Sequence, residues 1–192
     1  MSKTLDLVKD SIFCAIICTF IILINYLTGL TDGISTLFII VFIGCYFQNK
    51  SYTRVLVSSL VILMISFLVV PNPLIVIIFI LTSLILGNVS SLFLKKINDK
   101  KVFYLFLGII FFIINFVIDL LYATLIMNMD FFTYIITDDL VEFPAYINDF
   151  STLIVVLYTV LIAVVSFLET IILRNCNILY KKRIMKIIGE KE

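Results

Sequence analysis

Histidine and tryptophan are both absent from this 192-residue sequence, and glycine and proline are scarce. Without histidine there is neither the general base of Ser-His-Asp and Cys-His catalysis nor an imidazole ligand for zinc. The six glycines include no Gly-Lys-Ser/Thr triplet, so the phosphate-binding loop of many ATP-hydrolysing proteins is missing. These absences favour a protein that is not an enzyme, holds no metal or cofactor and does not hydrolyse ATP by that route.

Charge is also scarce, since only 14% of the residues are charged and 62% are hydrophobic, with a mean hydropathy of +1.22. Soluble domains carry about 25% charged residues, and a globule of this size could not bury so much apolar side chain. We therefore predict an integral membrane protein that is surrounded by the lipid bilayer. The net charge of +1 gives no sign of a nucleic-acid partner, and we expect none.

The gaps between charged residues predict an all-α polytopic protein with six membrane-spanning helices in a single bundle. From residue 55 to residue 94 there is no charge, over about twice the ~20 residues that a bilayer requires. Pro71-Asn72-Pro73 divides this run, because proline ends helices and disfavours helix in the residue before it. We predict one membrane domain, residues 1–192, with spans at about 11–29, 33–48, 54–70, 73–94, 102–127 and 152–173.

All 14 lysines and arginines fall before the first span, after the last one, or in the connections near residues 50 and 98, and therefore on one side. The positive-inside rule makes that side cytoplasmic, with both termini and the basic tail 174–192 inside. We expect a multi-pass protein of a prokaryotic plasma membrane. The opposite side carries loop 128–151, which has five acidic residues and no base. This loop predicts either a lid over a pocket or an aromatic belt at the bilayer surface.

Two ionisable residues, Asp119 and Glu169, lie inside the predicted spans, where a charge costs about 2.5 to 3.5 kcal/mol and usually serves a function. Asn115, Asp119 and Tyr122 are spaced i, i+4 and i+7, so they share one helix face in the outer half of their span. They predict a ligand-binding pocket open to the outside, to which Asn25 would contribute. The alternative is a set of interhelical hydrogen bonds, worth about 0.6 kcal/mol each.

Glu169 lies five residues before Arg174, near the predicted cytoplasmic end of its span, so we expect it to lie apart from Asp119. There it would pair with the inner basic loops or contact a partner. Small residues predict faces where helices approach closely. They occur as Ala15 with Thr19 at the start of the first span, and as Ser83, Gly87, Ser90 and Ser91 along the fourth.

The layout of the chain resembles the substrate-binding S component of energy-coupling factor (ECF) transporters. The shared features are its size, six spans with both termini inside, a tight first outer turn, a proline-containing second outer turn, a long outer loop and a basic tail. The resemblance is one of layout and hydropathy and covers nearly the whole chain. It implies an importer subunit for a vitamin or other small micronutrient, with the ligand in the outer half of the later spans, as Asn115, Asp119 and Tyr122 are placed.

The same resemblance implies partners, namely a membrane coupling subunit and cytoplasmic ATPases. S components dock on the coupling subunit through alanines spaced by four at the start of span one, which correspond here to Ala15 and Thr19. Thr19 stands where that family has alanine. Glu169, near the cytoplasmic face, is a further candidate for partner docking.

Two other functions stay open. The rod-shape-determining membrane proteins, which scaffold cell-wall synthesis, are similar in size and span number. That family usually opens its second span with Pro-Asp, whereas here the span opens with Asp32-Gly33 and no proline. The chain could also be a subunit of a larger membrane complex, in which Asp119 and Glu169 would be assembly contacts.

Overall fold

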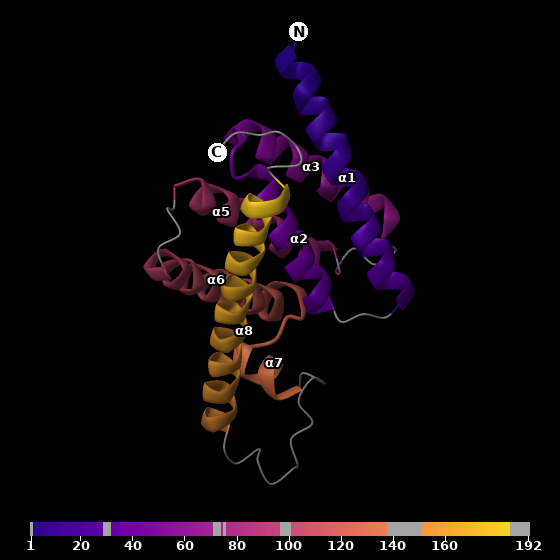
Figure 1. Ribbon diagram of the computed structural model, residues 1–192. Helices are drawn as coiled ribbons and strands as arrows, with labels where there is room; N and C mark the ends of the chain where they lie inside the picture. Colours follow the sequence, from indigo (N-terminus) through magenta and orange to yellow (C-terminus); the bar gives the residue numbers. More distant parts are fainter. Residues whose placement is uncertain are drawn as a thin grey trace. The chain divides into compact units, whose positions relative to one another are not determined.

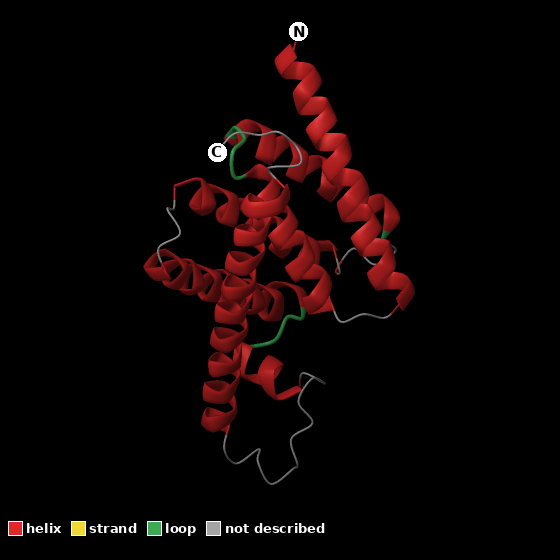
Figure 2. Ribbon diagram, in the orientation of Figure 1, coloured by secondary structure: helices red, strands yellow, loops and turns green. Residues whose placement is uncertain are grey.

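The computed structural model describes residues 2–28, 32–70, 74, 76–96, 101–137 and 151–184, and every regular element among them is a helix (Figure 1, Figure 2). The all-α prediction is therefore confirmed for this part of the chain. The α-helices are α1 (Ser2–Thr28), α2 (Asp32–Phe47), α3 (Tyr52–Val69), α5 (Leu81–Lys96), α6 (Lys101–Leu121), α7 (Phe131–Thr137) and α8 (Ser151–Leu179). Three short π-helical segments, η1 (Val76–Ile80), η2 (Tyr122–Ile126) and η4 (Tyr180–Ile184), adjoin α5, α6 and α8.

Five helical segments in the described residues are long and apolar enough to cross a membrane. They are Thr4–Asn25, Tyr52–Val69, Ile78–Lys95, Val102–Ile126 and Leu153–Lys182. The remaining predicted span, 33–48, corresponds to α2, whose apolar part, Ile34–Phe47, is shorter. The 16 residues of α2 reach about 24 Å at 1.5 Å per residue, less than the ~30 Å of a typical hydrocarbon core.

Both end helices are longer than the apolar segments that predicted them. Helix α1 begins at Ser2, nine residues before the predicted span, and α8 continues past Arg174 to Leu179 and into η4. Hydropathy identifies only the apolar part of a helix. Lysine, arginine and leucine all favour helix, so a helix can continue beyond its apolar part. The first half of the predicted tail 174–192 is therefore helical.

Helix ends follow the local sequence. Helix α3 ends at Val69, and Val70, the residue before Pro71, is extended with φ −91° and ψ 121°, as proline requires of its predecessor. After η2 the backbone turns at Asn128, which has φ 52°, a left-handed conformation that asparagine tolerates better than most residues. Asp130 then caps α7, because its Oδ1 accepts the N–H of Thr133 at 2.9 Å.

The chain divides into two compact units, and each is described by itself. Unit 1 comprises Met1–Phe103 with Ile171–Glu192, and unit 2 comprises Tyr104–Thr170. The single bundle that we predicted remains a prediction.

Helices pair in unit 1 through small residues. On α2 and α5, a Cβ added at Gly44 would lie 2.9 Å from the Cβ of Ser90, and one added at Gly87 would lie 2.9 Å from the Cβ of Ile43. The backbones therefore approach more closely than two larger side chains would permit, which confirms that the small residues of the fourth predicted span lie at a helix contact. Helices α1 and α3 also pack together, with the hydroxyls of Ser11 and Ser58 3.1 Å apart.

Candidate functional site

A polar seam joins α6 and α8 inside unit 2. The side-chain amide of Asn115 donates to Ser166 Oγ at 3.0 Å and to Glu169 Oε2 at 3.4 Å. Ser166 is fully buried and Glu169 is 9% exposed. Ser166 and Glu169 are three residues apart, so they lie on one face of α8 and meet the same amide.

The expectation that Glu169 lies apart from the Asp119 face is corrected by this contact, whereas its pairing with the basic loops and its role in partner docking stay predictions. Its neighbour Asn115 is one turn from Asp119 on the same face of α6. The sequence placed Glu169 near a cytoplasmic helix end because Arg174 follows it closely. In the structure α8 continues to Leu179, ten residues beyond Glu169 or roughly 15 Å, so this carboxylate is well inside the helix.

Asp119 and Tyr122 continue the seam along α6. The hydroxyl of Tyr158 on α8 donates to Asp119 Oδ2 at 3.2 Å. Tyr122 begins the π-helical segment η2, and its carbonyl accepts the N–H of Met127 at 3.1 Å. Such π-helical turns are frequent at functional sites. Asn115, Asp119 and Tyr122 therefore lie on contiguous turns, with Asn115 and Asp119 bonded to α8.

Helix α7, which belongs to the predicted outer loop, covers the Tyr122 end of this seam. Tyr134 meets Tyr122 edge to face at a ring distance of 5.7 Å, and Phe131 meets the ring of Tyr158 at 6.3 Å. Phe131 also contacts Phe116 of α6 at 5.3 Å. The loop thus places aromatic rings against the tyrosine that holds Asp119. The remaining loop positions, 138–150, lie outside the described residues.

Asn25, the fourth predicted ligand residue, lies in unit 1. With Ser35, Thr36 and Ser83 it lines a small cavity of about 20 Å³ between α1, α2, η1 and α5. A cavity of this size holds one water molecule. Asn25 also lines a larger, mostly apolar cavity of about 260 Å³ with Phe20, Ile34 and Phe38, so its part in ligand binding stays a prediction.

The two small residues of α1 lie at a surface groove. Ala15 and Thr19, with Phe20 of the same helix and Val61 and Ile65 of α3, line a groove of about 400 Å³. Ala15 is 3% exposed, whereas Phe20 on the rim is 63% exposed. The floor is therefore low and the rim is high and apolar, a shape that accepts the side chains of another helix.

A charged cluster at the start of α1 and α3 was not identified from the sequence as a site. Asp10 Oδ1 is 2.6 Å from Lys50 Nζ and accepts the Tyr46 hydroxyl at 2.8 Å, and Asp10 Oδ2 is 3.3 Å from Arg54 Nη1. Asp10 is only 7% exposed, and Arg54 also reaches Asp6 at 3.4 Å. The sequence did offer a signal for this cluster. Asp10 stands just before the first predicted span, on the same predicted side of the membrane as Lys50 and Arg54 of the next inner connection.

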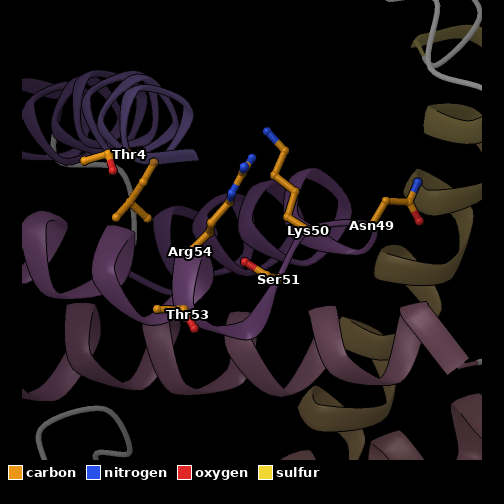
Figure 3. Close-up of a pocket in the computed structure, with 7 residues that line it drawn as sticks. Thr4, Asn49, Lys50, Ser51, Thr53 and Arg54 are labelled. Carbon is orange, nitrogen blue, oxygen red and sulfur yellow. The ribbon is translucent and has the colours of Figure 1, made fainter. Parts of the chain in front are cut away.

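A cavity of about 710 Å³ adjoins this cluster (Figure 3). Lys50 and Arg54 line it together with the hydroxyl residues Ser51 and Thr53. In contrast, the described residues contain no group of three or more Cys, Asp or Glu side chains arranged to hold a metal ion.

No protein-family model matches the sequence, and no curated protein and no solved structure shows significant similarity to it.

Proposed function

We propose that the protein is the substrate-binding membrane subunit of an ECF-type importer for a vitamin or another small micronutrient. In this function it is a six-span protein of a prokaryotic plasma membrane, with α2 as the short second span and both termini in the cytoplasm. This orientation is favoured by the location of all basic residues on one predicted side of the membrane. The absence of a phosphate-binding loop from the sequence requires that partner ATPases supply the energy of uptake.

The observation that carries this function is the groove over Ala15 and Thr19. Lipid tails are as apolar as leucine, so the hydrophobic effect does not hold membrane helices together, and close packing over small residues is the main alternative. The groove combines a floor of small residues with exposed apolar residues on its rim, Ile16 and Phe20. It lies at the positions where the resemblance to S components predicts docking on the coupling subunit.

The ligand would bind at the α6–α8 seam. Asp119 Oδ2 accepts the hydroxyl of Tyr158 at 3.2 Å, and in this function a donor group of the ligand takes the place of that hydroxyl, so that the carboxylate stays hydrogen-bonded. Tyr122 and the rings of α7 offer aromatic faces for a heteroaromatic ligand. In this mechanism α7 moves aside to admit the ligand and closes over it, while Asn115 stays bonded to Ser166 and keeps α6 and α8 together.

Purification of the tagged protein from its native cells in mild detergent tests this function. We expect a membrane coupling subunit and two ATPases to be recovered with the wild-type protein and to be lost with Thr19→Leu, which fills the groove. Thr19→Ala is the matched control, because it keeps the floor low and should retain the partners. Recovery of cell-wall synthesis proteins in their place would contradict the importer and favour the rod-shape scaffold.

The pocket is tested separately from the docking groove. Asp119→Asn and Tyr122→Ala, which removes the aromatic ring, should each reduce uptake of the micronutrient by roughly tenfold or more while leaving partner recovery unchanged, because both residues lie in unit 2 and the groove lies in unit 1. Unchanged uptake in both variants would mean that the seam does not bind the ligand.

A second candidate function is a structural subunit of a larger membrane complex. The observation in its favour is that Asn115 and Asp119 already bond to α8 within the chain. In that case the seam stabilises the helix pair, and Asp119→Asn would lower stability without changing the uptake of any solute.

A further inference from the structure

A second groove in unit 1 has a volume of about 890 Å³ and a mostly apolar wall. The wall is formed by Phe13 and Ile17 of α1, Phe38 and Phe42 of α2, and Leu179 of α8. The rings of Phe13 and Phe42 are 6.2 Å apart across the α1–α2 contact. A groove of this volume and composition accepts a flexible hydrocarbon chain, whose apolar surface is thereby removed from water.

One end of this groove is charged. Lys9, Asp10 and Lys50 line it there, at the N-terminal side of α1 and just beyond the C-terminus of α2. Lys50 is held in place, since its Nζ lies 2.6 Å from Asp10 Oδ1 and 3.9 Å from the centre of the Tyr46 ring. The groove therefore changes along its length from aromatic and aliphatic side chains to ordered cations.

Lys50 also lines the 710 Å³ cavity, together with Arg54, Ser51 and Thr53. Figure 3 shows Lys50 and Arg54 extending to the same side of the segment that carries Ser51. Two cations beside hydroxyl groups are the donors that phosphate oxygens prefer. Asp10 contacts both cations and Asp6 contacts Arg54, so these two carboxylates balance the pair. Lys9, which lines the adjoining groove, supplies the excess positive charge for an anion.

We propose that this surface binds one anionic phospholipid, with its phosphate on Lys50 and Arg54 and an acyl chain in the groove between Phe13, Phe38 and Phe42. The chemistry of the two cavities, joined at Lys50, matches the two parts of such a lipid. Basic residues beside a membrane span attract anionic headgroups at the cytoplasmic surface, the side on which we predict Lys50 and Arg54. This binding is independent of the importer function and of its groove on α1 and α3.

Lipid binding is measured by native mass spectrometry of the detergent-purified protein titrated with phosphatidylglycerol or with phosphatidylcholine of identical chains. We expect phosphatidylglycerol to bind at least tenfold more tightly. Lys50→Gln with Arg54→Gln should lower its affinity about 30-fold, since each cation near a membrane surface contributes about a fivefold factor. The control, Lys95→Gln, removes an exposed charge of α5 that lines neither cavity and should leave the affinity unchanged.

A second variant keeps the test informative where the loss of Lys50 prevents folding. Val41→Trp fills the apolar groove and leaves every charge in place, and it should also abolish the preference for phosphatidylglycerol. Four results would overturn the proposal. They are equal binding of the two lipids, an equal loss in the control variant, retained lipid binding in Val41→Trp, and inorganic phosphate or a second copy of the chain occupying the site in place of lipid.

Discussion

The close approach of α2 and α5 at Gly44 makes a quantitative prediction about stability. In Gly44→Ala the new Cβ would lie 2.9 Å from Ser90 Cβ, whereas carbon atoms in contact prefer about 3.5 to 4.0 Å. Both carbons are attached directly to the backbone, so no side-chain rotation relieves the overlap and the helices must separate. The new methyl also meets Leu173 Cδ1 at 3.2 Å, but this atom ends a rotatable side chain and can move.

Overpacking of this kind costs about 1 to 3 kcal/mol, and alanine recovers about 1 kcal/mol over glycine through helix propensity. We therefore expect Gly44→Ala to destabilise the protein by about 1 kcal/mol, a net value that is small because the two effects oppose each other. Ser90→Gly alone should also cost about 1 kcal/mol, since it adds a helical glycine and opens a small cavity. The Ser90 hydroxyl donates to Leu86 O in its own helix at 2.7 Å, and that carbonyl keeps its place in the helix when the hydroxyl is removed.

The double variant Gly44→Ala/Ser90→Gly moves the methyl from one helix to the other and restores the fit. Its stability should return to near that of the wild type, which gives a coupling energy of about 2 kcal/mol between the two sites. Reversible unfolding of the detergent-purified protein in sodium dodecyl sulfate, followed by tyrosine fluorescence and circular dichroism, measures all four variants. Losses that simply add, within about 0.5 kcal/mol, would refute the close contact of α2 with α5.

Other variants test the two polar clusters by the same unfolding assay. Asp10→Asn should destabilise unit 1 by about 2 kcal/mol, because partly buried Lys50 loses its carboxylate and Arg54 keeps only the exposed Asp6. Asp6→Asn, at the exposed pair with Arg54, should cost less than about 0.5 kcal/mol. An equal loss in both would mean that Asp10 has no special role. Asn115→Leu should cost about 1 to 2 kcal/mol of stability, because buried Glu169 loses the amide that donates to it. The double variant Asn115→Leu/Glu169→Gln should recover part of that loss. If it recovers nothing, the Asn115 amide stabilises the helix pair through Ser166 alone.

The exposed apolar surface of the helices matches the sequence interpretation. Leu68, Leu125 and Met64 are 86%, 76% and 69% exposed, and such residues on several helices would form an apolar surface too large for water. Lipid contact explains them without a further partner. The grooves on α1 are distinguished from this general surface by their shape and, for the larger one, by its charged end.

Much of the fold could be predicted from local patterns. Composition alone required a membrane environment, charge gaps located each long helix, and Pro71 predicted the end of α3 that Val70 makes. The spacing of Asn115 and Asp119 correctly predicted a shared helix face, since both bond to α8 and the 3.6-residue period acts within one element; the place of Tyr122 on that face stays a prediction. The helix ends were less predictable, because α1 and α8 continue through charged residues that interrupt the apolar runs.

Local patterns by themselves thus determined which segments are helical and which of their faces carry polar groups. Only the tertiary structure decided which faces meet. Asn115 bonds Glu169 across 54 residues of sequence, and Asp10 holds Lys50 across 40. These pairings depend on how each helix is rotated about its axis and how closely it approaches its neighbour. Both are set by side-chain packing, such as Gly44 against Ser90, which no periodicity within a single helix records.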